Sequence, residues 1–127
     1  MVNSSIAPAT PTVLVVDDDP AVLSSLQFCL EIEGFAVRCY SSGPEILDDP
    51  SMPRSGCLVI DYRLPGMNGL DVLAELRRRN VMLPAILVTT HPSTSLRARS
   101  TAAGATLVEK PLLNEALFER IRQLMAG

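Results

Sequence analysis

The sequence is poor in aromatic residues: it has no tryptophan, three phenylalanines and two tyrosines in 127 residues. A hydrophobic core must therefore be built mainly from aliphatic side chains, and hydrophobic residues make up 47% of the chain. This length suffices for one domain with a well-buried core. No internal repeat and no change in composition indicates a second domain.

Cysteine and histidine, which are common metal ligands, are also scarce. Cys29, Cys39 and Cys57 lack the spacing of a metal-binding motif and lie within apolar stretches. We expect them to be buried, reduced thiols, which suits a reducing cytosol. The single histidine, His91, is interpreted as an exposed loop residue.

Long apolar runs are missing as well. None approaches the length of a membrane-spanning helix. Residues 1–11 lack the basic start and apolar stretch of a signal peptide, and we interpret them as a flexible leader before a domain at 12–127. We expect a cytoplasmic location.

Positive charge is limited, and the formal net charge of −3 argues against broad nucleic-acid binding by this domain. The dense basic run Arg77-Arg78-Arg79 suits the C-terminal end of a solvated helix, where cations complement the helix dipole. No G-x-G-x-x-G or Walker loop follows the first apolar run. A nucleotide- or flavin-binding module is therefore disfavoured.

The chain does contain a regular alternation of short apolar runs and helical patterns. Strands are predicted at Val13–Val16, Phe35–Tyr40, Cys57–Ile60, Ala85–Val88 and Thr106–Val108. Helices are predicted from Pro20 to Gly34, after the capping-box pattern Ser42-Gly43-Pro44-Glu45, along Leu70–Leu76, at Ser93–Ala103 and at Asn114–Met125. This order is typical of a parallel sheet covered by helices.

Polar residues follow the apolar runs where the predicted strands end. They are Asp17-Asp18-Asp19, Asp61, Thr89-Thr90 and Glu109-Lys110-Pro111. If the strands are parallel neighbours, these residues meet at one edge of the sheet, where open α/β sheets bind ligands.

Asp17, Asp18 and Asp61 would then repel one another. Two unit charges about 4 Å apart interact by roughly 4 kcal/mol at an effective dielectric constant near 20. Lys110 supplies one compensating cation, and the remaining negative charge favours Mg²⁺, which keeps coordination positions for phosphate oxygens. An aspartate can also act as a nucleophile toward phosphorus, with the Thr89 hydroxyl donating to a phosphate oxygen.

These motifs resemble those of receiver domains of two-component response regulators. The resemblance is carried by Asp17-Asp18-Asp19, by the segment Asp61–Gly69 (D-Y-R-L-P-G-M-N-G), by Thr89 and by Glu109-Lys110-Pro111, and it covers about Thr12 to Met125. Gly34-Phe35, a Thr-x-His run and Glu-Lys-Pro make it look closest to the FixJ and NarL types of transcriptional regulator.

The resemblance implies a flavodoxin-like α/β fold with a doubly wound, five-stranded parallel sheet in the order 2-1-3-4-5. It implies that Asp61 accepts a phosphoryl group from a histidine kinase, with Thr89 as the switch hydroxyl and Lys110 as the phosphate-binding ammonium. The implied Mg²⁺ ligands are Asp18 directly, Asp17 through water, Asp61, and the backbone carbonyl of Arg63. The Lys110-Pro111 bond is expected to be cis.

The resemblance also implies a signalling switch. Phosphorylation would change the surface formed by the fourth helix, the fifth strand and the last helix, and so control dimerisation or an effector such as a helix-turn-helix DNA-binding domain. The fourth predicted helix has Leu96 as its only large apolar residue. We expect this helix to be among the easiest elements to shift.

Some positions depart from the family pattern. Leu107 replaces the usual Tyr or Phe, so a large ring rotation is not available to the switch. Thr90 stands where Gly or Ala is commoner, and it could narrow access to Asp61; Arg63 and His91 flank the same crevice and could alter the lifetime of an acyl phosphate. We hypothesise that phosphorylation still occurs but changes the surface by an altered route.

Two alternative functions use the same carboxylates. One is a small Mg²⁺-dependent phosphohydrolase with an aspartyl nucleophile, but Arg63 occupies the place of its usual second acid and no insertion could cap a substrate. The other is a degenerate receiver used only for docking.

Overall fold

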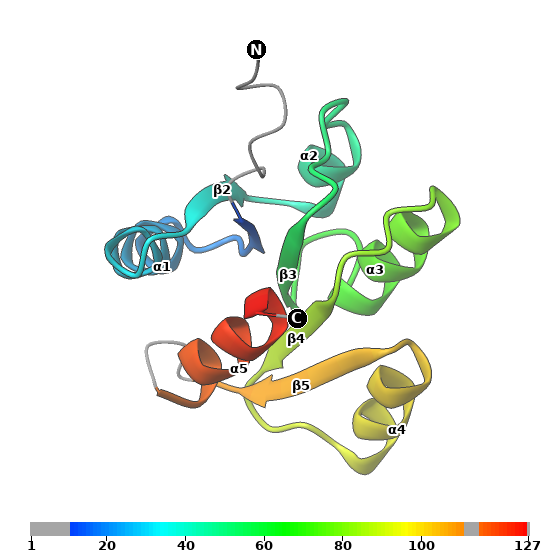
Figure 1. Ribbon diagram of the computed structural model, residues 1–127. Coiled ribbons are helices and arrows are strands. Elements are labelled where there is room, and N and C mark those ends of the chain that lie inside the picture. Colours follow the sequence, from blue (N-terminus) through cyan, green and yellow to red (C-terminus); the bar gives the residue numbers. More distant parts are fainter. Residues whose placement is uncertain (1–10, 111–114, 127) are drawn as a thin grey trace.

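The computed structural model describes residues 11–110 and 115–126, in which strands and helices alternate (Figure 1). The strands are β1 (Thr12–Val16), β2 (Ala36–Tyr40), β3 (Gly56–Asp61), β4 (Ala85–Thr89) and β5 (Ala105–Glu109). The helices are α1 (Pro20–Ile32), α2 (Gly43–Leu47), α3 (Gly69–Arg78), α4 (Thr94–Ala102) and α5 (Glu115–Ala126). Every strand and helix expected from the sequence is present.

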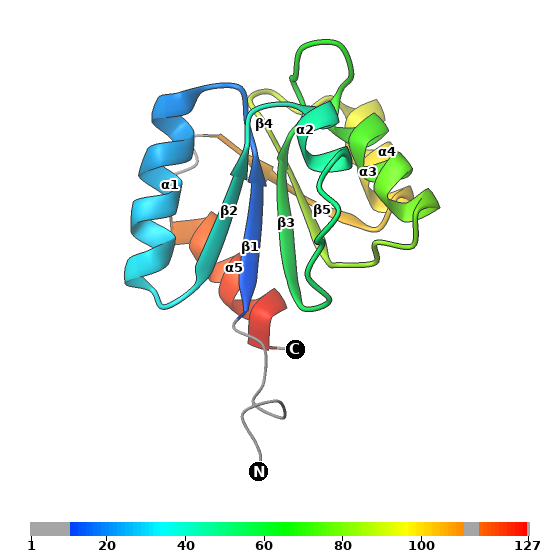
Figure 2. The ribbon, with the colours of Figure 1, turned by 90° about the horizontal axis from the view of Figure 1, so that it is seen from above.

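The strands form one parallel sheet in the order β2-β1-β3-β4-β5, which confirms the doubly wound fold. Helices α1 and α5 cover one face, and α2, α3 and α4 cover the other (Figures 1 and 2). The strand order places β1, β3 and β4 in the interior of the sheet, so the ends of these strands lie side by side.

Aliphatic side chains fill the space between the sheet and both helix layers. Along β1, Leu14 and Val16 pack under the α2–α4 face, whereas Val13 and Val15 pack under the α1–α5 face, and all four are almost completely buried. Because side chains alternate between the faces of a strand, a sheet covered on both sides requires an unbroken apolar run. The scarcity of aromatic residues is therefore compatible with a dense core.

Side chains define most helix starts. Asp19 caps α1 by accepting a hydrogen bond from the Ala21 backbone N–H at 2.9 Å. At α2 the predicted capping box forms only in part: Ser42 accepts from the Glu45 N–H, but the Glu45 carboxylate accepts from Ser41 instead of from the N–H of the cap residue. Because Ser41 directly follows β2, its hydrogen bonds to the Glu45 carboxylate still anchor the first turn of α2 to the end of that strand.

The cysteines are free thiols, but only one matches the expected burial. Cys57 is completely buried in β3. Cys29 and Cys39 are half-buried because Cys29 lies on a flank of α1 and Cys39 lies on the edge strand β2. Burial raises the pKa of the Cys57 thiol to about 12, which makes it a poor nucleophile.

Some expectations lie outside the described residues: the leader at residues 1–10, the first residue of the last predicted helix, and the isomer of the bond to Pro111. Among the described helices, none combines the length and the apolarity needed to cross a membrane.

Candidate functional site

The carboxyl edge of the sheet brings the predicted polar residues together. Asp17 directly follows β1, Asp61 ends β3, Thr89 ends β4 and Lys110 directly follows β5. Backbone hydrogen bonds of 2.8 Å hold these strand ends in register, from the Tyr62 N–H to the Val88 carbonyl and from the Lys110 N–H to the Thr89 carbonyl. Residues up to 93 positions apart in the chain therefore share one edge.

Three carboxylates lie close enough together that they could hold one metal ion. Asp17, Asp18 and Asp61 each offer one oxygen, and these oxygens all lie within 4.8 Å of one another. Asp17 and Asp61 are buried, with 1% and 4% of their surface exposed, while Asp18 is exposed. The site therefore has one carboxylate facing solvent and two that are largely withdrawn from it.

Lys110 provides the cation that the sequence predicted for this edge. Its Nζ lies 3.0 Å from Asp61 Oδ2 and 3.7 Å from Asp17 Oδ2. Burial by itself would lower the pKa of this ammonium, but the hydrogen bond and charge of Asp61, with the charges of Asp17 and Asp18, raise the pKa above its ordinary value. Lys110 is therefore a fixed positive charge at neutral pH.

Asp17 remains electrostatically unfavourable despite this partner. Burial, together with the negative charges of Asp61 and Asp18, raises the pKa of its carboxyl; the hydrogen bond from the Asp19 N–H and the charge of Lys110 lower it by less. Oxygen Oδ1 accepts that Asp19 hydrogen bond at 2.9 Å. The buried oxygen Oδ2 has no hydrogen-bond partner among the described residues.

Asp17 Oδ2 bears on the fit of a metal ion, because it accepts no hydrogen bond from the described residues and the Lys110 ammonium lies 3.7 Å away. A buried carboxylate oxygen without a hydrogen bond is costly, and a metal ion in direct contact would satisfy it more fully than an ammonium at that distance. Carboxylate and carbonyl oxygens are the ligands that Mg²⁺ prefers, and few of them are needed because this ion keeps several waters. The acidic cluster Asp17, Asp18 and Asp61 is therefore compatible with Mg²⁺ binding.

Asp61 is held from two sides. Its Oδ1 accepts a hydrogen bond from the Arg63 backbone N–H at 3.2 Å, and its Oδ2 accepts the one from Lys110. The Arg63 side chain is exposed. The backbone of residue 63 is thus placed beside the carboxylate, while its guanidinium is directed to solvent.

The last glycine of the Asp61–Gly69 segment has a packing reason. A Cβ atom at Gly69 would lie 2.5 Å from the Asp61 backbone oxygen, 2.8 Å from a Leu87 methyl and 3.0 Å from the Tyr62 Cα. The Gly69 N–H also donates to the Tyr62 carbonyl at 2.8 Å. Only glycine lets α3 begin so close to the end of β3, and this contact fixes the loop behind Asp61.

The remaining predicted residues occupy the β4 and β5 side of the edge. Thr89 is buried with 5% of its surface exposed, whereas Thr90 and His91 are exposed, as predicted for His91. Leu107 is half-buried and packs against the same core cluster as Leu96 of α4. At the position where the family usually has an aromatic residue, an aliphatic side chain therefore packs against the core cluster that contacts α4.

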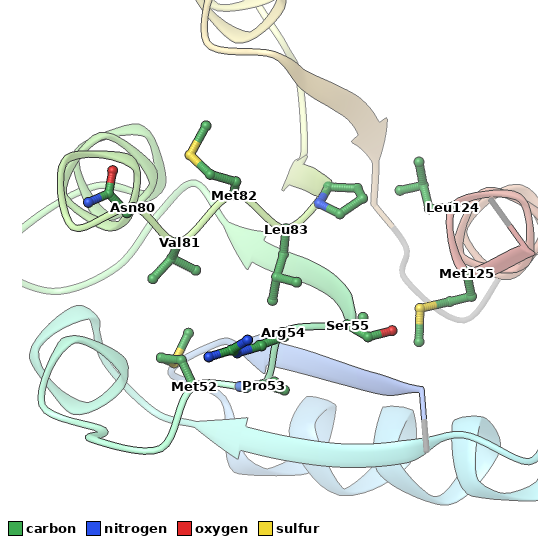
Figure 3. Close-up of a pocket in the computed structure, with 12 residues that line it drawn as sticks. Met52, Pro53, Arg54, Ser55, Asn80, Val81, Met82, Leu83, Leu124 and Met125 are labelled. Atoms are coloured by element: carbon green, nitrogen blue, oxygen red, sulfur yellow. The ribbon is translucent and has the colours of Figure 1, made fainter. Parts of the chain in front are cut away.

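A cavity of about 480 Å³ lies at the opposite, amino edge of the sheet, and the sequence patterns did not indicate it. It is bounded by the segments that precede β3 and β4 and by the end of α5; Val81 and Leu83 face Met52 and Arg54 across it (Figure 3). No carboxylate lines it. The cavity is therefore separate from the acidic cluster Asp17, Asp18 and Asp61.

Comparisons with known proteins agree with this geometry. Residues 13–122 match the family model described as "Response regulator receiver domain". The chain is 37% identical over 116 residues to the transcriptional regulatory protein FixJ of Azorhizobium caulinodans, covering 91% of this chain and 55% of that protein. It is 34% identical over 111 residues to the response regulator protein TodT of Pseudomonas putida, covering 87% of this chain and 49% of that protein.

The chain thus spans about half the length of the curated relatives it matches. Among solved structures, the crystal structure of FixJ-N has a TM-score of 0.82 at 32% identity, covering 94% of this chain and 97% of that one. A matching sequence model, relatives above 30% identity, and a parallel sheet that gathers the acidic residues at its carboxyl edge all agree: this chain belongs to the response regulator receiver domain family of two-component signalling systems.

Proposed function

We propose that Asp61 is the phosphoacceptor of this receiver domain and that a histidine kinase is its phosphodonor. The observation that carries the proposal is the position of Asp61: it is buried at the acidic edge, 3.0 Å from Lys110, and within 4.8 Å of Asp17 and Asp18. A carboxylate fixed in this way can attack phosphorus without first reorganising its surroundings.

In the proposed transfer, a carboxylate oxygen of Asp61 forms a bond to phosphorus. The bond from phosphorus to the leaving group breaks, and its electron pair departs with the leaving group. Lys110 neutralises charge on the phosphoryl oxygens, and the Thr89 hydroxyl donates a hydrogen bond to one of them. Slow hydrolysis of the acyl phosphate resets the domain.

Mg²⁺ would be held by Asp17, Asp18, Asp61 and the backbone carbonyl of Arg63. When bound, it supplies positive charge that offsets the negative charge of the carboxylates and the phosphoryl group. The contribution of Asp17 is supported by its buried oxygen Oδ2, which accepts no hydrogen bond from the described residues. Asp18, the exposed member of the cluster, is the ligand most accessible from solvent.

The proposed output is a change in the surface formed by α4, β5 and α5, which would control homodimerisation or contact with an effector. A DNA-binding domain, either C-terminal or in a separate protein, is the proposed effector, since the relative FixJ is a transcriptional regulatory protein. No direct nucleic-acid or membrane binding by this domain is proposed, and its proposed location is the cytoplasm.

The experiment is intact mass spectrometry after incubation with acetyl phosphate and Mg²⁺. The wild type should gain the mass of one phosphoryl group, and Asp61→Asn should gain none. Addition of a chelator should abolish the gain in the wild type. An unchanged mass in the wild type, or an equal gain in Asp61→Asn, would refute the assignment.

Turnover of p-nitrophenyl phosphate is the companion measurement. A receiver should release p-nitrophenol no faster than its slow self-dephosphorylation allows. Sustained turnover that depends on Asp61 would instead favour the phosphohydrolase.

A further inference from the structure

Helix α4 is anchored to the domain by very few side chains. Of its nine residues, only Leu96 and Ser100 are buried, and the other seven are exposed. These two residues are four positions apart, so they lie on the same face of the helix. One of the two anchors of α4 is therefore a polar residue.

The hydroxyl of Ser100 has no hydrogen-bond partner among the described residues, although Ser100 is only 1% exposed. The neighbouring Thr101 shows the usual solution, since its hydroxyl donates to the Arg97 carbonyl at 3.0 Å. A buried hydroxyl that has given up water without gaining a partner opposes burial. Docking of α4 is therefore weaker with Ser100 than it would be with an apolar residue of similar size.

A short path connects α4 to the phosphorylation site. Residues 90–93 join buried Thr89 to the start of α4, and the Thr89 carbonyl accepts a hydrogen bond from the Lys110 N–H. The other anchor, Leu96, belongs to the core cluster against which Leu107 packs. A displacement of Thr89 toward a phosphoryl group would thus be transmitted to a helix that has few buried contacts.

We propose that Ser100 is a positioning residue of the receiver switch. Its unpaired hydroxyl keeps the unphosphorylated arrangement of α4 weak, so that phosphorylation of Asp61 shifts the helix without the ring rotation that Leu107 excludes. The weak packing of α4 depends on the contacts of Ser100 alone. Its effect on the switch also rests on the proposed function of Asp61.

The first test compares Ser100→Ala with Ser95→Ala. Both changes replace serine by alanine within α4, but Ser95 is exposed whereas Ser100 is buried. Amide hydrogen exchange in α4, measured without Mg²⁺ or a phosphodonor, should be about tenfold slower in Ser100→Ala than in Ser95→Ala. Equal or faster exchange would show that the hydroxyl is satisfied and would overturn the proposal.

The second test measures coupling to the site with beryllofluoride, a phosphoryl mimic, and Mg²⁺. Since the mimic must shift a more stable α4, Ser100→Ala should need up to about tenfold more of it to reach half-saturation than Ser95→Ala, as followed by amide chemical shifts in α4. Slower exchange with an unchanged titration would reduce Ser100 to a packing residue and overturn its role in the switch.

The wild type separates failure of this inference from failure of the proposed function. A wild type that binds no beryllofluoride and gains no phosphoryl mass would refute Asp61 as the acceptor, and with it the switch role of Ser100. The exchange comparison would still decide the packing effect. A responsive wild type with no difference between the two variants would refute the inference about Ser100 alone.

Discussion

Helices α3 and α4 follow adjacent strands and cover the same face of the sheet, yet they are anchored very differently (Figure 2). Helix α3 buries Gly69, Leu70, Val72, Leu73 and Leu76. Helix α4 buries Leu96 and a serine whose hydroxyl is unpaired among the described residues. Since apolar burial is the main source of helix stability in proteins, we expect α3 to belong to the rigid frame of the domain and α4 to be the easier helix to shift.

The same contrast holds for the two loops that lead to these helices. The loop from Asp61 to α3 is fixed by the contact at Gly69 and by a reciprocal capping box, in which Asn68 accepts from the Asp71 N–H and Asp71 accepts from the Asn68 N–H. The loop from Thr89 to α4 ends in a single cap at Ser93. The acceptor side of the site is therefore held in place, whereas the side expected to move is tied more loosely.

The largest expected difference comes from truncating one core leucine in each helix. Leu73→Ala should lower the free energy of unfolding by about 3 kcal/mol, because the α3 layer cannot close over the missing volume. Leu96→Ala should cost only about half as much, because α4 can shift to fill the space. Urea denaturation measures both. Equal losses would contradict the view that α4 is the looser element.

A methyl group at Gly69 should also be strongly destabilising. Gly→Ala within a helix is normally stabilising by up to about 1 kcal/mol, but at Gly69 the clash with the Asp61 carbonyl should reverse the sign and lower the free energy of unfolding by about 2 kcal/mol. Thr90→Ala in the other loop is the matched change at an exposed position and should stay within about 0.5 kcal/mol. A stable Gly69→Ala variant would show that the loop behind Asp61 can yield.

The acidic edge between the two loops should respond to Mg²⁺ and to pH through Asp17. Since the pKa of Asp17 in the folded domain is raised above its ordinary value of 3.8, its contribution to stability is fully present below that value and is lost as the pH rises through the folded pKa. Asp17→Asn should therefore increase thermal stability at neutral pH without Mg²⁺, and should remove this part of the pH dependence.

Mg²⁺ should stabilise the wild type more than Asp17→Asn. At ten times its dissociation constant it should add about 1.4 kcal/mol to the unfolding free energy of the wild type and much less to that of Asp17→Asn. Thermal melts with and without a chelator measure this. A wild-type melting temperature that is the same with and without Mg²⁺ would argue against the metal site.

The smallest effect is expected from the two helix caps. Asn68→Ala should lower the global unfolding free energy by about 1 kcal/mol, because α3 unfolds only with the rest of the domain. Ser93→Ala removes a cap of similar strength, but hydrogen exchange should change only within α4 while global stability stays nearly constant. A Ser93→Ala variant that lowers global stability as much as Asn68→Ala would place α4 in the rigid frame.

Much of the fold and of the acidic edge follows from local patterns in the chain. Three unbroken apolar runs predicted the buried strands β1, β3 and β4, and Leu70, Leu73 and Leu76 predicted the buried stripe of α3. The residues that gather at the carboxyl edge followed from a parallel sheet, because strand ends are the only place where they can meet. The poor anchoring of α4 was also readable from its single large apolar residue.

Other features needed the contacts themselves. The sequence does not reveal that Asp17 keeps a buried oxygen without a hydrogen bond, or that Cys29 and Cys39 are only half-buried. It also does not reveal that the Glu45 carboxylate accepts its hydrogen bond from Ser41, the residue before the predicted cap Ser42. The cavity at the amino edge was missed because its lining comes from three separate segments with no shared pattern.

The amino-acid order alone therefore determined the kinds of element, the aliphatic core and the identity of the acidic residues, since helix and strand periodicity and capping act over a few neighbouring positions. Tertiary structure decided which of those residues are desolvated and which find a partner. Ser100 illustrates the reason. The packing of α4 on the sheet decides that its hydroxyl is buried and that it lacks a hydrogen-bond partner among the described residues. Burial and hydrogen bonding between distant segments depend on the whole packed domain, and no local pattern encodes them.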